Sequence, residues 1–148
     1  MEWKLGEQLC FLLYANSRHV IKLYKDLLDP FNLTYTQYIT MIALWEEDHQ
    51  TVSSLGEKLA LDSGTLTPML KKLEQEGKIT RTRDQKDERR VWIDLTDEGK
   101  KLSKEAERIP QELVKCVDLP YSDAMKLFEI LTKLHQSQKT CDTGVQDE

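Results

Sequence analysis

The segment LDSGTLTPMLKKLEQEG (61–77), followed by ITRTR (79–83) and VWIDL (91–95), is the most informative part of this sequence about its fold. Within 61–77 the apolar residues recur at positions i, i+3, i+4 and i+7, which is the spacing of one helical face. These residues are Leu66, Met69, Leu70 and Leu73. Gly77 supplies the C-terminal stop of this helix. The two following segments alternate around a charged tip, which indicates a β-hairpin.

The start of the 61–77 helix is less sharply defined than its end. Asp62 and Ser63 are both candidate N-caps, because either side chain can accept a hydrogen bond from the first helical turn. If Ser63 is the cap, Pro68 lies past the first turn and removes a backbone hydrogen bond to Gly64. The sequence then predicts that the helix starts later or has an irregular first turn.

The neighbouring segments predict a winged helix-turn-helix. A short helix at 52–61 precedes the turn, and the order short helix, turn, amphipathic helix and charged hairpin is that of this DNA-binding unit. We therefore expect a mostly α-helical protein with a small β-hairpin wing, and a DNA-binding domain at 33–96. The alternative is a small α+β domain whose hairpin is a solvated surface.

The candidate DNA contacts lie on the outward face of the 61–77 helix and on the wing. Hydroxyl groups allow close approach to phosphates and base edges, and lysines add attraction that is independent of sequence. Arginines of the wing suit the negative potential of a minor groove. The helix supplies Ser63, Thr65, Thr67, Pro68, Lys71, Lys72 and Gln75, and the wing supplies Arg81, Arg83, Arg89 and Arg90.

The distribution of charged residues along the chain is consistent with DNA contact by the segment 63–90 alone. The net charge is −5 over 148 residues, which excludes a uniformly basic nucleic-acid binder. Residues 63–90 nevertheless carry eight basic and five acidic side chains, which leaves 13 basic and 21 acidic residues elsewhere. An acidic body with a basic segment suits a protein that touches a polyanion locally, although a solvated charged face would look the same.

Long apolar helices flank this unit. One is expected at 5–28, ended by Asp29-Pro30, and one at 122–136; a helix capped by Thr96 runs towards Ile109 until Pro110 interrupts or kinks it. Since a chain of this size buries little core, we expect 1–32 and 97–138 to form a helical dimerisation region. A two-fold dimer would place its two reading helices ~34 Å apart. The tail at 139–148 is expected to be disordered.

The three cysteines, Cys10, Cys116 and Cys141, form no disulfide framework, and their number and spacing indicate free thiols in a reducing compartment. The longest uninterrupted apolar stretch, at 9–15, is seven residues, so no membrane span is expected, and no signal peptide is evident. We expect a cytoplasmic location. The histidines are scattered, so the sequence predicts no metal site and no cofactor.

Two tyrosines, Tyr14 and Tyr24, follow Cys10 on nearly the same face of the first predicted helix. Tyr14 lies at i+4 from Cys10 on the same face, whereas Tyr24 is ~21 Å further along the axis. Tyr24 therefore reaches a Cys10 thiol only across two antiparallel helices of a dimer, where Tyr35, at the start of the second helix, could join it. Phenol O–H groups would stabilise a thiolate, which is a peroxide target. The alternative is that Cys10 is a small buried apolar residue.

The strings LCFLLYANSR (9–18), LTYTQY (33–38), LDSGTLTPMLKKLEQEG (61–77), DERR (87–90) and LTDEGK (95–100) resemble the MarR family of winged-helix repressors, over about residues 5–105. They are most similar to its OhrR branch of organic-hydroperoxide sensors. The resemblance implies a homodimer that binds a palindromic operator when reduced. It implies that Cys10 is the peroxidatic cysteine and that Tyr24 and Tyr35 come from the other subunit. It also implies that Asp87 orients Arg89 for minor-groove contact.

The same branch divides according to the fate of the sulfenic acid. One type forms a mixed disulfide with a low-molecular-weight thiol, and another uses a resolving cysteine of the partner subunit. Cys116 lies in roughly the region of that resolving cysteine, and Cys141 is an alternative or an exposed thiol without a role. Three rival functions remain: a MarR-type repressor induced by a small aromatic ligand, a thiol peroxidase and a zinc sensor. The wing and the lack of further catalytic groups around Cys10 argue against an enzyme, and the scattered histidines against zinc.

Overall fold

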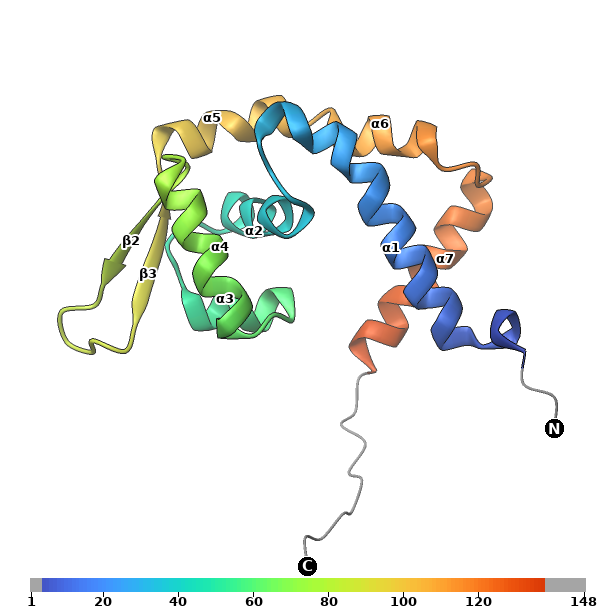
Figure 1. Ribbon diagram of the computed structural model, residues 1–148, viewed down its shortest axis with the longest axis horizontal. Helices are drawn as coiled ribbons and strands as arrows, with labels where there is room; N and C mark the ends of the chain where they lie inside the picture. The colour runs from blue at the N-terminus through green and yellow to red at the C-terminus, as the bar shows by residue number, and fades with distance from the viewer. Residues whose placement is uncertain (1–3, 138–148) are drawn as a thin grey trace, which may run out of the picture. The chain divides into compact units, whose positions relative to one another are not determined.

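The computed structural model describes residues 4–137, which fall into two units divided between Cys116 and Val117. The first unit is a mostly helical winged helix-turn-helix, which confirms the predicted fold class (Figure 1). Its elements are η1 (Leu5–Glu7), α1 (Leu9–Leu28), η2 (Asp29–Phe31), α2 (Tyr35–Glu46), β1 (Gln50–Thr51), α3 (Val52–Leu59), α4 (Ser63–Gln75), β2 (Ile79–Arg83), β3 (Val91–Leu95), α5 (Asp97–Ala106) and α6 (Ile109–Cys116). In the second unit the described helix is α7 (Tyr121–Gln136).

The first long helix begins later than the sequence suggests. The 5–28 pattern is divided by Gln8, whose extended backbone (φ −89°, ψ 114°) separates η1 from α1. At the other end Pro30 lies in the single turn of η2, and Asn32 adopts a left-handed conformation (φ 50°) that redirects the chain. Thr34 then caps α2 through a capping box with Gln37, so the position of Tyr35 in the first turn of α2 is fixed.

The turn and second helix of the DNA-binding unit are well capped. Asp62, not Ser63, is the N-cap of α4, and its carboxylate accepts hydrogen bonds from the backbone N–H and the hydroxyl group of Thr65 (both 2.9 Å). The helix continues through Pro68 without a break, so neither a late start nor an irregular first turn is needed. The lost backbone bond is tolerated because Gly64 is exposed and its carbonyl group can bind water.

The wing belongs to a three-stranded antiparallel sheet in the order β1-β3-β2. The predicted hairpin of β2 and β3 is present, with Arg83 paired with Val91 and Ile79 with Leu95. The strand β1 was not predicted, because two residues are too short to show a period. Pairing of Gln50 with Ile93 ties the wing to the segment that leads into α3. Figure 1 shows β2 and β3 extending away from the helices beside α4.

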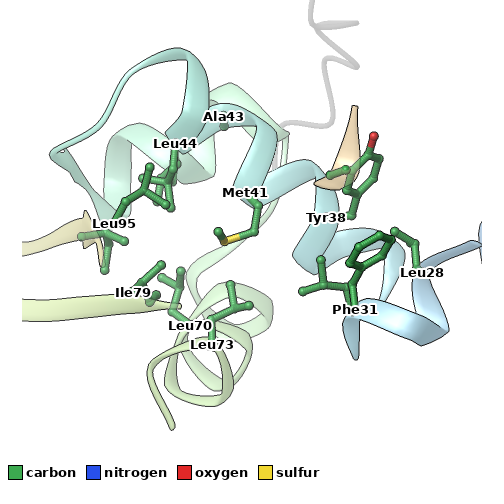
Figure 2. Packing of buried hydrophobic residues seen from close by; sticks show 14 of the residues in the cluster. Leu28, Phe31, Tyr38, Met41, Ala43, Leu44, Leu70, Leu73, Ile79 and Leu95 are labelled. Carbon is green, nitrogen blue, oxygen red and sulfur yellow. The ribbon is translucent and has the colours of Figure 1, made fainter. Parts of the chain in front are cut away.

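The hydrophobic core joins α2, α4, the sheet and the end of α1. In Figure 2, Leu28, Phe31 and Tyr38 lie at one end of the cluster and Ile79 and Leu95 at the other. Fully buried side chains of this kind stabilise the fold by ~1.5–3 kcal/mol each. This core fixes the directions of α4 and of the wing, which carry the candidate DNA contacts.

The helix that Thr96 caps is shorter than predicted. α5 ends at Ala106, and α6 starts at Ile109, with Pro110 in its first turn, where a proline costs no hydrogen bond. The indole N–H of Trp45 donates to the Gly99 carbonyl oxygen (2.9 Å) and so attaches α5 to α2. In Met1–Cys116, α1 and α6 contact each other. Within residues 4–137 no helix has the length and apolar character needed to cross a membrane.

Candidate redox site and nucleic-acid interface

Three tyrosines form one cluster between α1 and α2. The ring centroid of Tyr24 lies 4.9 Å from that of Tyr35 and 5.7 Å from that of Tyr38. Burial, followed by the proximity of Tyr35 and Tyr38, raises the pKa of Tyr24 to about 12. Burial and Tyr35 also raise the pKa of Tyr38. These two phenols therefore stay protonated at neutral pH and can donate hydrogen bonds.

The sequence analysis placed Tyr24 and Tyr35 at one site but did not include Tyr38. This residue is 3% exposed, and its ring packs on Tyr24 and on Trp45 (6.4 Å between centroids), so Tyr38 supports the pair. The signal was present, because Tyr35 and Tyr38 are three residues apart and share one face of α2.

Cys10 lies in the first turn of α1 as an exposed free thiol. Exposure rules out, within this single chain, the interpretation of Cys10 as a buried core residue. Tyr14, one turn further on, is 58% exposed, and its hydroxyl oxygen accepts a hydrogen bond from the Arg18 guanidinium (3.2 Å). That guanidinium also lies over the Tyr14 ring (5.6 Å). Because its oxygen is the acceptor, the Tyr14 O–H proton stays available for a further partner.

Large apolar side chains are exposed on two helices of the single chain. On α1 these are Leu9, Leu12, Leu13 and Ile21. On α7 they are Met125, Leu127, Phe128, Ile130, Leu131 and Leu134. Groups of large exposed apolar residues of this kind mark surfaces that bind another protein.

The outward face of α4 is exposed as predicted. Ser63, Thr67, Pro68, Lys71 and Lys72 all lie on the surface, while the leucines of the opposite face are buried. Thr65 is exposed too, but its hydroxyl group is hydrogen-bonded to the Asp62 cap. Gln75 is also exposed at the C-terminal end of the helix. The helix therefore offers hydroxyl groups near its N-terminus and ammonium groups along the same surface.

The wing arginines have different environments. Arg81 is held by Glu74 of α4, whose two carboxylate oxygens accept from its backbone N–H (3.1 Å) and its Nε (2.9 Å). Its side chain is 24% exposed, so Arg81 attaches the wing to α4. Arg83 and Arg89 are exposed, and among residues 4–137 no acidic side chain is paired with either guanidinium.

Asp87 acts on both arginines of the wing tip in different ways. Its carboxylate accepts from the backbone N–H of Arg89 (3.1 Å) and lies 3.6 Å from Nε of Arg90. The structure therefore places the Arg90 guanidinium, rather than that of Arg89, beside Asp87.

Sequence reasoning also missed Asp84 and Trp92, whose contact joins a loop residue to a strand residue and has no periodic signal.

Of the other two cysteines, the structure describes only Cys116, which lies in a different helix from the tyrosine cluster. Cys116 is the last residue of α6, exposed, and its thiol donates to the Glu112 carbonyl oxygen (3.5 Å). Cys141 and the tail at 139–148 lie outside the described residues. The described part of the chain has no group of three or more His, Cys, Asp or Glu side chains placed to hold a metal ion.

The fold, the exposed face of α4 and the wing define a winged helix-turn-helix transcriptional regulator of the MarR type. The chain belongs to the family of SarA/Rot transcriptional regulators, whose family model matches residues 22–106. This is not a family of enzymes. The family assignment confirms the resemblance expected from the sequence.

Two known proteins illustrate the similarity. The organic hydroperoxide resistance transcriptional regulator of Bacillus subtilis is 49% identical over 137 residues, covering 90% of this chain and 93% of that protein. AbfR of Staphylococcus epidermidis, solved reduced and bound to DNA, is 38% identical with a TM-score of 0.78, covering 89% of this chain and 90% of AbfR. A disulfide-formed structure of AbfR gives 38% identity and a TM-score of 0.63, covering 89% and 88%.

Proposed function

We propose that this regulator is a repressor whose reduced homodimer binds double-stranded operator DNA and is released when an organic hydroperoxide oxidises Cys10. The observation that carries this proposal is the Tyr24–Tyr35 ring contact at 4.9 Å. Two phenols from different helices converge, and one of them has its pKa raised to about 12. Such a pair is a hydrogen-bond donor site for an anion.

The anion that this site would receive is the Cys10 thiolate of a second subunit. Cys10 and Tyr24 are fourteen residues apart on one helix, so within one chain they are ~21 Å apart along the axis. If two α1 helices cross antiparallel, the Cys10 end of one reaches the Tyr24 end of the other. Tyr14, with its free O–H proton, then approaches the thiolate from its own subunit.

The exposed apolar surfaces support a homodimer. Residues 1–32 and 97–138 would form the dimerisation region and residues 33–96 the DNA-binding domain. The exposed leucines of α1 and the apolar face of α7 are the surfaces that pairing would bury. Two α4 helices related by a two-fold axis then face successive major grooves of a palindromic operator, ~34 Å apart.

The proposed oxidation requires no metal or cofactor. The Cys10 thiolate attacks the terminal oxygen of the hydroperoxide, forming an S–O bond as the O–O bond breaks. Sulfur is oxidised to the sulfenic acid, the peroxide is reduced, and the departing alkoxide takes a proton from water to leave as the alcohol. The sulfenic acid then condenses with a thiol, forming a disulfide and releasing water.

The thiol that completes this step has three candidates: Cys116 of the partner, Cys141, or a low-molecular-weight thiol. The environment of Cys116 favours the first, because its thiol is exposed at the end of α6. Formation of a disulfide would pull Cys10 away from the phenols and change the crossing of the α1 helices. A dimer whose two α4 helices no longer match the half-site spacing loses specific affinity.

The alternative is a repressor induced by a small aromatic ligand that binds without a covalent bond. An open groove of about 870 Å³ beside the start of α2 favours this function, because Arg18, Lys22 and Lys25 line it together with Tyr35. Such a groove would suit an aromatic carboxylate. Induction by this route would not need Cys10.

A gel-shift experiment separates these functions. The DNA is a duplex selected in vitro from a random library by the reduced wild-type protein. Cumene hydroperoxide should release the wild type, whereas Cys10→Ser should stay bound. Cys116→Ser tests the resolving step, and a crosslink between subunits that persists in this variant on non-reducing electrophoresis would exclude Cys116 as the resolving thiol. Release of Cys10→Ser by the hydroperoxide would contradict the proposal, and sustained peroxide consumption with a thiol reductant would indicate an enzyme.

A further inference from the structure

The Asp84 carboxylate makes several of the hydrogen bonds that order the loop at the tip of the wing, residues 84–90. Oδ1 of Asp84 accepts hydrogen bonds from the backbone N–H groups of Lys86 (2.8 Å) and Asp87 (3.1 Å). The backbone N–H of Asp84 donates to the Arg90 carbonyl oxygen (3.0 Å), which closes the loop. Asp87, placed by these bonds, then accepts from the backbone N–H of Arg89 (3.1 Å).

The second oxygen of Asp84 connects this loop to the sheet. Oδ2 accepts a hydrogen bond from the indole Nε1 of Trp92 (2.9 Å), a residue of β3. The indole also stacks on the His49 ring, with centroids 4.3 Å apart and planes 3° from parallel. His49 is in turn fixed by Asp94, 2.6 Å from its Nδ1. The tip is therefore connected through Trp92 to the segment that precedes β1.

The charge of Asp84 is maintained by these contacts. The Trp92 indole, together with the two backbone amides and nearby Arg90, holds the pKa of the Asp84 carboxyl group below its usual value. An ionised carboxylate makes stronger hydrogen bonds than a neutral acceptor. Arg89 is exposed, and within residues 4–137 no acidic side chain is paired with its guanidinium.

We propose that Trp92 and Asp84 are positioning residues for DNA binding, which hold the wing tip in the conformation that presents Arg89 to the DNA groove. The inference rests on the proposed DNA-binding function and adds two residues that act through Arg89. A loop already ordered in the free protein loses less conformational entropy on binding, so its order adds to affinity.

Two variants remove the same hydrogen bond from its two ends. Trp92→Phe deletes the indole N–H but keeps a ring that can stack on His49. Asp84→Asn keeps an oxygen for the backbone N–H groups but turns an N–H₂ group towards the indole. Gln85→Ala is the control, because Gln85 is exposed on the same loop. Affinity for the selected duplex is measured by fluorescence anisotropy, and folding by circular dichroism.

We expect Trp92→Phe and Asp84→Asn each to weaken binding about fivefold, and Gln85→Ala to have no effect. In an Arg89→Ala background neither substitution should weaken binding further, because the group that they position is gone. Equal weakening in both backgrounds would show a general structural role and overturn the inference. So would wild-type affinity of both variants while Arg89→Ala binds weakly. If the wild type selects no DNA, the proposed function itself fails.

Discussion

The ring of Tyr24 in α1 lies 4.9 Å from the ring of Tyr35 in α2, and the two planes are tilted by 50°. Tyr38 packs on Tyr24 from the same helix as Tyr35. This arrangement stabilises the α1–α2 junction and also presents two phenols together. The two roles of these tyrosines can be tested separately, because substitution by phenylalanine keeps the ring for packing and removes the hydroxyl group.

Tyr24→Phe should slow the oxidation of Cys10 without affecting DNA binding by the reduced protein. Loss of one hydrogen bond to the thiolate is expected to cost ~1.4 kcal/mol, or about tenfold in rate. The measurement is the loss of free Cys10 thiol during exposure to cumene hydroperoxide. Tyr121→Phe, at an exposed position in the first turn of α7, is the control. An unchanged rate for Tyr24→Phe would contradict the proposed site.

The stability of the protein should fall in the alkaline range because of the same cluster. The pKa of Tyr24 rises from 10.0 to about 12 on folding, so between these values the unfolded chain loses its proton while the folded chain keeps it. The stabilisation is complete below pH 10 and is lost as the pH rises through about 12. Because the ring is partly exposed, we expect a loss of order 1 kcal/mol. Urea unfolding at fixed protein concentration measures it, and a pH dependence as steep in Tyr24→Phe would refute the assignment.

Arg81 and Arg83 should respond differently to alanine substitution, although they lie on one face of β2. Arg81→Ala breaks the pair with Glu74, so we expect a loss of ~0.5–1 kcal/mol in stability. Arg83→Ala should leave stability unchanged and weaken DNA binding, with a smaller dependence of affinity on salt. Thermal unfolding and binding at two salt concentrations test both. Equal stability losses would show that the Glu74 contact contributes nothing specific.

Gly99→Ala should be strongly destabilising, because a Cβ atom at this position would lie 2.1 Å from the Lys78 carbonyl oxygen. Relief of that clash requires α5 to move away from the start of β2. We expect a loss of ~3 kcal/mol, at the upper end for overpacking, measured by urea unfolding. Gly6→Ala is the control, since its Cβ would meet nothing within 4 Å. A small effect at Gly99 would mean that α5 can shift at little cost.

Local sequence patterns predicted most of the helices and both strands of the wing. They left the N-cap of α4 open between Asp62 and Ser63, and they placed the start of the first long helix at residue 5 instead of Leu9. Thr34, Asp62 and Thr96 cap their helices through contacts within three residues, and the apolar spacing of 66–73 states which face is buried. Such features are local, so the order of residues along the chain is sufficient to define them. The winged helix-turn-helix and its exposed hydroxyl and lysine face follow from them.

The features that depend on residues far apart in the chain are visible only in the folded protein. The third phenol at Tyr38, the pairing of Arg81 with Glu74 and the contact of Trp92 with Asp84 depend on how helices and strands pack. The passage of α4 through Pro68 and the short strand β1 depend on it as well. Local propensity is weaker than the free energy gained by packing a whole core, so contacts between residues far apart in the chain are set by packing and leave no local sequence pattern.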